Sequence, residues 1–135
     1  MKLSVLMSVY YKEQPMSFDR AMQSIWDDQT VKPNEVVLVQ DGKLTNELYE
    51  VIEEWQGKFG QILKIIILKK NVGLGDALNA GLAECSYEIV ARMDTDDIAL
   101  PQRFEKQLKI FEANNVDVCS SWIGEFDKNE KEIVG

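Results

Sequence analysis

The sequence predicts an α/β domain with an open, doubly wound, mostly parallel sheet. Several short segments are rich in β-branched and large apolar residues and lack polar alternation, as is typical of strands buried on both faces. Between these segments, apolar residues recur at the helical spacing of i, i+4 and i+7. Strands that alternate with helices indicate βαβ units, and 135 residues suit one domain over residues 1–135.

The first βα unit begins at the N-terminus. The apolar segment LSVLMSVY predicts a strand over residues 3–10. A helix over 18–29 follows, with apolar residues on one face and Ser17 as its N-cap. The run EVVLVQ then predicts the second strand, over 35–40.

The middle of the chain repeats this alternation. The periodic segment TNELYEVIEEWQGKF predicts a helix over 45–59 with Thr45 as its N-cap, and LKIIIL predicts the third strand, over 63–68. A shorter helix is expected over 74–84. Its expected buried face consists of Leu74, Leu78, Gly81 and Leu82.

The last third predicts two further strands around one helix. YEIVARM indicates a strand over 87–93, and VDVCSSWI another over 116–123. Between them a helix over 101–114 is expected, with Pro101 in the first turn, where a missing N–H is tolerated. The polar end reads as a turn and the start of another strand. That last segment is either an edge strand or a sign that the chain is the front part of a longer protein.

The composition excludes several classes of function. Fifteen Lys and Arg against 23 Asp and Glu give a formal net charge of −8, which argues against binding of nucleic acid or anionic lipid through a general basic field. The absence of histidine excludes a Ser-His-Asp triad, a Cys-His pair and histidine-ligated zinc. Cys85 and Cys119 lack CxxC spacing and stand among apolar residues, so we interpret them as reduced core residues and not as a disulfide.

The N-terminal apolar segment is interpreted as a strand and not as a signal peptide, because Ser4 and Ser8 interrupt it and no small-residue cleavage site follows. The run IIIL over 65–68 is far too short to span a bilayer. We therefore expect a cytoplasmic protein, either free or located at the inner face of the membrane.

Three aspartates, Asp94, Asp96 and Asp97, occupy four positions after the fourth predicted strand. Side chains at i and i+2 of an extended chain point the same way, and paired carboxylates suit Mg²⁺ or Mn²⁺. Capping of the next helix is the alternative, but Pro101 in its first turn would make Leu100 the cap. We therefore expect Asp94 and Asp96 to hold a divalent metal that bridges to phosphate oxygens. Asp97 could instead cap a short turn.

Ligands of doubly wound sheets bind outside the carboxyl ends of the strands. That edge is expected to hold Asp41, although Asp41-Gly42 is equally typical of a plain turn. Asn71 and Gly73 precede a helix whose N-terminal amides could face an anion. Arg92, a cation inside an apolar strand, could reach a phosphate or form a structural ion pair.

Taken together, four segments resemble the family 2 glycosyltransferases, whose nucleotide-sugar-binding half has the GT-A fold, a Rossmann-like sheet. These segments are SVLMSVYYKE, EVVLVQDG, NVGLGDALNAGL and ARMDTDDIALPQRFEKQL, in the family's order and over nearly the whole chain. The last of them, with SSWIGEF after it, is most similar to the bacterial exopolysaccharide and capsule-building subgroup.

The resemblance implies inverting transfer of a sugar from a nucleoside diphosphate donor, a UDP-sugar being favoured, to a hydroxyl of a saccharide or lipid-linked saccharide acceptor. By position, Asp41 would bind the base or ribose, and Asp94 and Asp96 would be the DxD pair that holds Mn²⁺ or Mg²⁺. The full set of nucleotide-sugar-binding residues implied in this way is Ser8, Val9, Tyr10, Asp41, Asn71, Gly73, Asn79, Arg92, Asp94, Thr95 and Asp96.

This sequence departs from the family pattern in two ways. Gln40 stands where many members have an acid before the Asp-Gly pair. The family's catalytic base and acceptor site lie in a second half that would begin beyond Gly135, so the chain is expected to be the donor-binding portion without its own base. Apolar surface left by a missing half makes a homo-oligomer a further hypothesis.

Two rival interpretations stay open at this point. A response-regulator receiver domain suits the length and acidity, but it needs an acidic pair after the first strand, where the chain offers only Glu13, and an aspartate ending the third strand, where it has LKKN. A noncatalytic nucleotide-binding module of the same fold would bind UDP without turnover.

Overall fold

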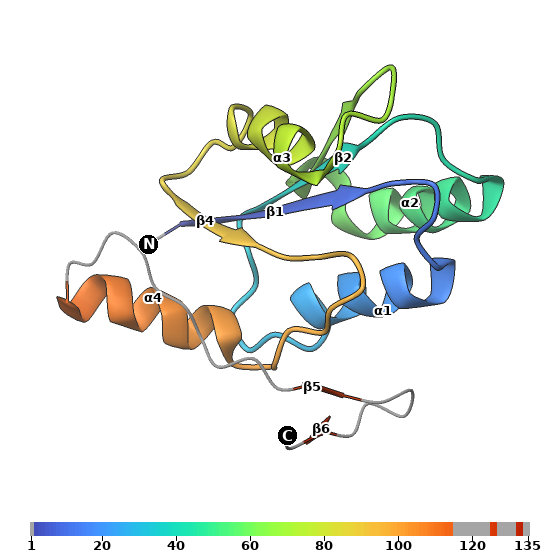
Figure 1. Ribbon diagram of the computed structural model, residues 1–135. Coiled ribbons are helices and arrows are strands. Elements are labelled where there is room, and N and C mark those ends of the chain that lie inside the picture. The colour runs from blue at the N-terminus through green and yellow to red at the C-terminus, as the bar shows by residue number, and fades with distance from the viewer. Residues whose placement is uncertain (1, 115–124, 127–131, 134–135) are drawn as a thin grey trace.

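Four parallel strands in the order β3-β2-β1-β4 form the sheet at the centre of the computed structural model (Figure 1). The structure describes residues 2–114, 125–126 and 132–133. The strands of the sheet are β1 Leu3–Val9, β2 Glu35–Gln40, β3 Leu63–Ile67 and β4 Ile89–Arg92. Every strand pair is parallel, so the prediction of an open, doubly wound α/β sheet is confirmed.

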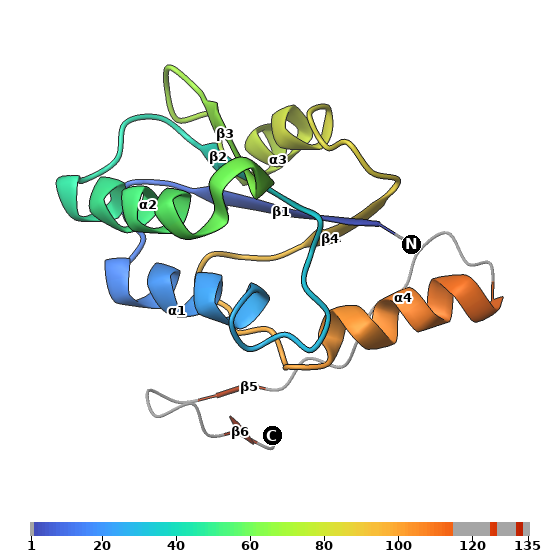
Figure 2. The same cartoon turned by 180° about the vertical axis from the view of Figure 1, so that it is seen from behind.

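Helices cover both faces of this sheet, as Figures 1 and 2 show from opposite sides. Their bounds are α1 Pro15–Ile25, α2 Asn46–Phe59, η1 Gly60–Ile62, α3 Leu74–Leu82 and α4 Arg103–Asn114. Helices α1, α2 and α4 pack on one face together, and α3 packs alone on the other.

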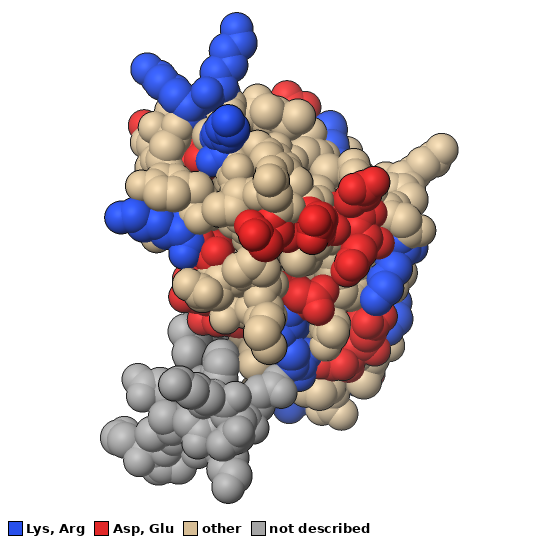
Figure 3. Space-filling model, turned by 90° about the vertical axis from the view of Figure 1, so that its right-hand side faces the viewer, with Lys and Arg blue, Asp and Glu red and all other residues tan. Residues whose placement is uncertain are grey.

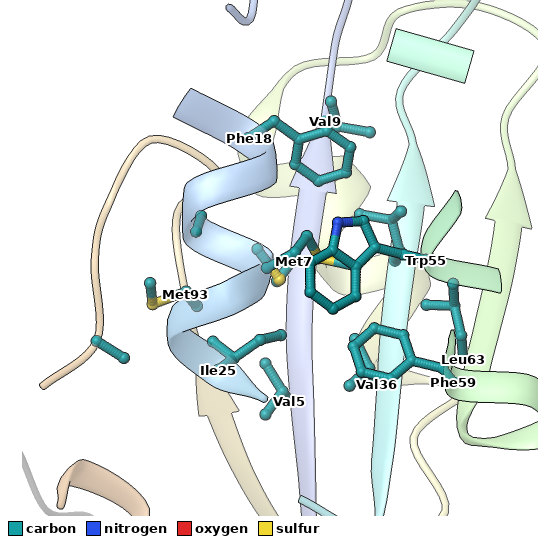
Figure 4. Close-up of a cluster of buried hydrophobic side chains, with 14 of the residues drawn as sticks. Val5, Met7, Val9, Phe18, Ile25, Val36, Trp55, Phe59, Leu63 and Met93 are labelled. Atoms are coloured by element: carbon teal, nitrogen blue, oxygen red, sulfur yellow. The ribbon is translucent and has the colours of Figure 1, made fainter. Parts of the chain in front are cut away.

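The larger core lies between the sheet and helices α1, α2 and α4. Met7 of β1, Phe18 of α1 and Trp55 and Phe59 of α2 are all buried there (Figure 4). The Trp55 ring stacks at a tilt on Phe59 with 5.2 Å between centroids, and its Nε1 donates a hydrogen bond to Asp19. Burial of each such side chain contributes about 2–3 kcal/mol, so this layer fixes the positions of the strand ends.

Helix α3 approaches the opposite face closely because Gly81 faces it. A Cβ at Gly81 would lie 2.5 Å from Leu6 Cδ1 and 2.6 Å from Val39 Cγ2, so these side chains or the helix would have to shift to accept it. The expected buried face of this helix is only partly correct. Leu78 and Gly81 are buried, together with Ala77, but Leu74 and Leu82 are 53% and 50% exposed.

Two predicted helix starts are wrong. Helix α1 begins at Pro15 and follows Gln14, so Ser17 lies inside the helix and is not its N-cap. Helix α4 begins at Arg103, and Pro101 lies in the turn before it instead of in its first turn. The N-cap of α2 is confirmed, since the Thr45 hydroxyl accepts a hydrogen bond from the Leu48 amide.

The end of the chain is described only in part. The predicted strand over 116–123 and Cys119 lie outside the described residues. Two short antiparallel strands, β5 Glu125–Phe126 and β6 Glu132–Ile133, fall where the sequence predicts a turn and the start of a strand. Within the part of the chain that the structure describes, every helix is too short or too polar to cross a membrane.

The strand order creates a switch point beside β1. The chain moves from β1 to β2 and β3 in one direction and then returns to place β4 on the other side of β1. The strand order therefore reverses between β1 and β4, and the carboxyl end of the sheet at such a reversal is the usual place for a ligand.

Candidate functional site

A hollow of about 350 Å³ opens at the carboxyl edge of the sheet, at the switch point between β1 and β4. We call it the acidic hollow, because acidic side chains form a band across this face of the molecule (Figure 3). Its lining residues are Ser8, Tyr10, Glu13, Asp41, Asn71, Gly73, Leu74, Asp94, Thr95 and Asp96. The hollow thus brings together residues from the ends of β1 and β2, from the β3–α3 loop and from the segment after β4.

The carboxylates after β4 are close enough to share one metal ion. Asp94, Asp96 and Asp97 are exposed, and each offers an oxygen within 4.8 Å of the others. Oxygens bound to one divalent ion at about 2.1–2.4 Å lie no more than roughly twice that distance apart, so these residues fit such an ion. The loop is closed by a hydrogen bond from the Asp97 amide to the Asp94 carbonyl.

The surroundings of Asp97, including the two neighbouring carboxylates, raise the pKa of its carboxyl. Burial raises the pKa of its carboxyl, and the charges of Asp94 and Asp96 raise it further, as does a hydrogen bond with the Asp94 side chain. Arg103 acts in the opposite direction without reversing the rise. A bound cation would remove this repulsion, because the anionic forms would then face positive charge.

Thr95 lies between the two predicted metal ligands and is 1% exposed. Within the described residues, its Oγ1 has no hydrogen-bond partner. A buried hydroxyl without a partner is rare in folded proteins, and Thr95 lines the acidic hollow, so a ligand bound there is a candidate partner for this atom.

Glu13 is a lining residue that the sequence did not single out as part of the site. Burial raises the pKa of its carboxyl, and the charges of Asp96 and Asp94 add to the rise, while the nearby Thr95 hydroxyl opposes it without reaching hydrogen-bond geometry. The only sequence signal was an acid in the loop after β1. Nothing local shows that this loop folds back toward β4.

Asp41 organises the hollow from the end of β2. It is 3% exposed, and its carboxylate accepts hydrogen bonds from the amides of Val72 at 2.7 Å and Gly73 at 3.2 Å. Asp41 therefore holds the β3–α3 loop in place. Each carboxylate oxygen keeps a further lone pair, so the predicted contact with a base or ribose stays a prediction.

Gly42 makes this arrangement possible. Its φ is +86°, and a Cβ there would lie 2.6 Å from the Asn71 nitrogen. A side chain would therefore push the two loops apart, since only glycine combines this conformation with such a close approach.

The segment that follows the acidic residues is held from behind by two buried polar side chains of the α1 region. Gln29 Nε2 donates to the carbonyls of Ser24 at 2.8 Å and Leu100 at 2.7 Å, and Gln29 Oε1 accepts from the Phe104 amide. The Ser24 hydroxyl accepts from the Ala99 amide at 2.9 Å. These bonds anchor the loop over residues 93–102 between β4 and α4, which we call the acidic loop, without using any of its carboxylates.

The structure divides the predicted site residues between two hollows. Arg92 and Asn79 line a second hollow, of about 310 Å³, between α3 and β4. We call it the α3–β4 hollow. Its lining residues are Leu6, Gly75, Leu78, Asn79, Leu82, Val90 and Arg92. Val9 reaches neither hollow with its side chain, which is fully buried in the larger core.

Relatives of this chain include proteins named as sugar transferases. The chain is 44% identical over 129 residues to the UDP-Gal:alpha-D-GlcNAc-diphosphoundecaprenol beta-1,3-galactosyltransferase of Escherichia coli, a match over 95% of this chain and 46% of that protein. It is 45% identical over 130 residues to the amylovoran biosynthesis glycosyltransferase AmsE of Erwinia amylovora, over 96% of this chain and 48% of that protein. The chain thus spans about half the length of the curated relatives it matches.

Solved structures share the fold. A crystal structure of Staphylococcus aureus TarS 1-349 in complex with UDP-GlcNAc matches with a TM-score of 0.72 and 25% identity, over 85% of this chain and 32% of that one. The mannosyltransferase PcManGT of Pyrobaculum calidifontis, in complex with GDP-Man and Mn²⁺, matches with a TM-score of 0.60 over 72% of this chain and 28% of that one. At 24% identity, the second likeness concerns the fold alone.

The model of glycosyl transferase family 2 matches residues 4–134 of the chain. This range includes all of β1 except Leu3, the acidic loop and every residue that lines the two hollows. The chain belongs to glycosyl transferase family 2.

Proposed function

We propose that this chain is the donor-binding portion of an inverting, metal-dependent glycosyltransferase. Its donor would be a nucleoside diphosphate sugar, with a UDP-sugar favoured. Its acceptor would be a hydroxyl of a saccharide or lipid-linked saccharide in bacterial polysaccharide synthesis. The relatives' names and the UDP-GlcNAc complex of TarS support this choice of substrates.

One observation carries the proposal. Three carboxylate oxygens within 4.8 Å of one another stand beside a buried hydroxyl that has no partner in the described chain, at the switch point of the sheet. Negatively charged carboxylates so close together repel one another and raise the free energy of the protein without a ligand. They become favourable when a divalent cation and the anion it carries arrive together.

The residues of the acidic hollow divide the work among them. Asp94 and Asp96 would hold the metal, Mn²⁺ or Mg²⁺, and the Thr95 hydroxyl would donate to an oxygen of the bound diphosphate. Asp41 keeps the loop of Asn71 and Gly73 closed against the hollow, on the nucleotide's side. When bound, the metal would supply positive charge to the departing diphosphate.

The catalytic base is not assigned to any described acid. The expectation that it lies beyond Gly135 stays a prediction, as does the division into a donor part and an acceptor part. An acceptor of the lipid-linked kind named for the E. coli relative would place the protein's work at the inner face of the membrane.

Calorimetric titration with UDP in the presence of Mn²⁺ tests the proposal. We expect metal-dependent binding that becomes at least about 100-fold weaker in Asp94→Asn plus Asp96→Asn, because two anionic ligands are lost. Glu53→Gln plus Glu54→Gln, which removes the same charge from the exposed face of α2, is the matched control and should bind as the wild type does. Unchanged metal-dependent binding in the double aspartate variant would refute the assignment.

A further inference from the structure

The acidic hollow at the carboxyl edge and the α3–β4 hollow have opposite charge. The acidic hollow is lined by Glu13, Asp41, Asp94 and Asp96, and none of its described lining residues is Lys or Arg. The α3–β4 hollow is lined by Arg92, and none of its described lining residues is Asp or Glu. Among the described lining residues, carboxylate ligands for a metal are therefore found only in the acidic hollow. The α3–β4 hollow would bind a different part of the ligand.

Arg92 offers hydrogen-bond donors that the described chain does not use. Its main-chain carbonyl accepts a bond from Arg103, but its guanidinium forms neither a hydrogen bond nor an ion pair within the described residues. A guanidinium carries five N–H donors in a planar fork. The neighbouring Asn79 side chain adds both a donor and an acceptor on the same hollow.

The rest of the α3–β4 hollow is apolar. Leu6 of β1 and Leu78 of α3 are almost fully buried at 1% and 6% exposure, and Val90 of β4 lies beside them. An apolar floor with a few polar groups suits a pyranose ring, which presents C–H faces and hydroxyl edges. It does not suit a diphosphate, whose oxygens would lose water against leucine and valine.

The two hollows are also placed in the order in which a donor's groups are linked. Leu74 lines the acidic hollow and Gly75 lines the α3–β4 hollow, so the first turn of α3 lies between them. Arg92 precedes Asp94 by two residues, a span of about 7 Å at most. A group attached to a diphosphate held at Asp94 would therefore be within reach of Arg92.

We propose that the α3–β4 hollow binds the hexopyranosyl group of the donor, with Arg92 and Asn79 hydrogen-bonded to its hydroxyls over the apolar floor. This inference rests on the proposed function and extends it, because it separates the residues that bind the nucleotide and metal from those that bind the sugar. Arg92 is then a residue that determines sugar specificity, and the diphosphate is left to the metal site.

The test compares ligands that share the nucleotide and differ in the sugar. Dissociation constants for UDP, UDP-glucose, UDP-galactose and UDP-GlcNAc are measured with Mn²⁺ by calorimetry on the wild-type chain and on Arg92→Ala. The variant should weaken the best-bound UDP-sugar by about tenfold, the size expected for lost hydrogen bonds to a charged donor, and change UDP affinity by less than about twofold.

A steric variant tests the same hollow without touching the cation. A Cβ at Gly75 would meet no atom within 4 Å, so Gly75→Leu should fold and fill the hollow. Gly57→Leu is its matched control, because Gly57 is exposed on α2 and a Cβ there also meets no atom within 4 Å. We expect Gly75→Leu to weaken binding of the UDP-sugar selectively, as Arg92→Ala does, and Gly57→Leu to leave the binding of both ligands nearly unchanged.

Each outcome bears on the inference. If Arg92→Ala weakened the binding of UDP and of the UDP-sugar equally, Arg92 would be assigned to the diphosphate and the inference would be wrong. Unchanged binding of all three UDP-sugars in both Arg92→Ala and Gly75→Leu would also overturn the inference. If the wild type binds UDP with Mn²⁺, such results reject this inference alone. If the wild type shows no metal-dependent UDP binding, the proposed function fails first and the sugar site fails with it.

Discussion

The two ends of the same sheet hold acidic residues in opposite surroundings. At the amino end, the Glu35 carboxylate accepts hydrogen bonds from the Ser4 hydroxyl at 2.8 Å and from the amide and hydroxyl of Ser86 at 2.8 and 2.7 Å. Burial alone would raise the pKa of Glu35, but these bonds and the nearby Lys64 outweigh it, so the pKa is lowered. At the carboxyl end, the pKa values of Glu13 and Asp97 are raised.

The difference separates acids that serve the fold from acids that serve a ligand. Glu35 joins the starts of β1 and β2 to the segment before β4, and its charge is satisfied by donors of the chain itself. The carboxylates of the acidic loop mainly face one another, and the backbone that carries them is held by Gln29 and Ser24 instead. Acids of the second kind lower stability unless something outside the chain compensates them.

The largest expected effect comes from removing the support behind the acidic loop. Gln29→Ala would leave the Leu100 carbonyl and the Phe104 amide without their partner, and both bonds form at a side chain that is 3% exposed. We expect the free energy of unfolding to fall by about 3 kcal/mol, measured by urea denaturation.

Gln56→Ala is the control for that measurement, since Gln56 is exposed on α2 and the change should be close to neutral. Metal-dependent UDP binding should weaken in Gln29→Ala and not in Gln56→Ala. A Gln29→Ala protein as stable as the wild type would show that the acidic loop is held by other contacts.

Replacement of Glu35, the acid whose carboxylate is hydrogen-bonded within the chain, has the next largest expected effect on stability. Glu35→Ala would leave the fully buried Ser4 hydroxyl without its acceptor and release the Ser86 amide, so we expect a loss of about 1–2 kcal/mol by urea denaturation. The exposed Glu53→Ala serves as control. UDP binding should be unchanged in both. If Glu35→Ala weakened it, the separation between the two ends would be wrong.

The hydrogen bonds of Glu35 also predict how the free energy of unfolding changes at low pH. The pKa of Glu35 is lower in the folded chain than its ordinary value of 4.5, so the contribution of Glu35 to stability is complete above the unfolded pKa and is lost as pH falls through the folded pKa. The stability difference between the wild type and Glu35→Ala should therefore shrink below about pH 4.5. A difference that grew toward low pH would contradict the assigned direction.

The smallest expected effect on stability comes from Asp97 in the acidic loop. Because the pKa of Asp97 is raised by burial and by Asp94 and Asp96, its charge is unfavourable in the metal-free fold. Asp97→Asn should stabilise the protein by up to about 0.5 kcal/mol in the presence of a chelator, as relief of exposed like charges does. Glu88→Gln, at another exposed position, should give no such gain. Destabilisation by Asp97→Asn would mean that Asp97 is a structural acid like Glu35.

Local patterns predicted the fold and the edge at which the site lies. The second strand, 35–40, and the Thr45 cap are confirmed, because an unbroken apolar run and a side-chain hydroxyl three residues before its amide partner are both local features. The family match also sets aside the receiver alternative. The expected edge holds the expected loops, since parallel strands place their carboxyl ends together.

What the sequence missed depends on contacts between distant residues. Helix α4 starts later than Pro101 suggests because Gln29, more than seventy residues earlier in the chain, takes the Leu100 carbonyl and the Phe104 amide. Leu74 and Leu82 are exposed on α3 because Gly81 sets the side on which the helix meets Leu6. The separation of Arg92 from the acidic hollow likewise follows from where α3 lies, which spacing along the chain does not reveal.

Diffraction from crystals grown with UDP and Mn²⁺, recorded at the manganese absorption edge, would show whether Asp94 and Asp96 hold the metal on the diphosphate. We expect an anomalous peak about 2.1–2.4 Å from oxygens of Asp94 and Asp96 and in contact with the diphosphate. UDP bound without a peak between these carboxylates, or carboxylates turned away to accept hydrogen bonds from backbone amides, would contradict it.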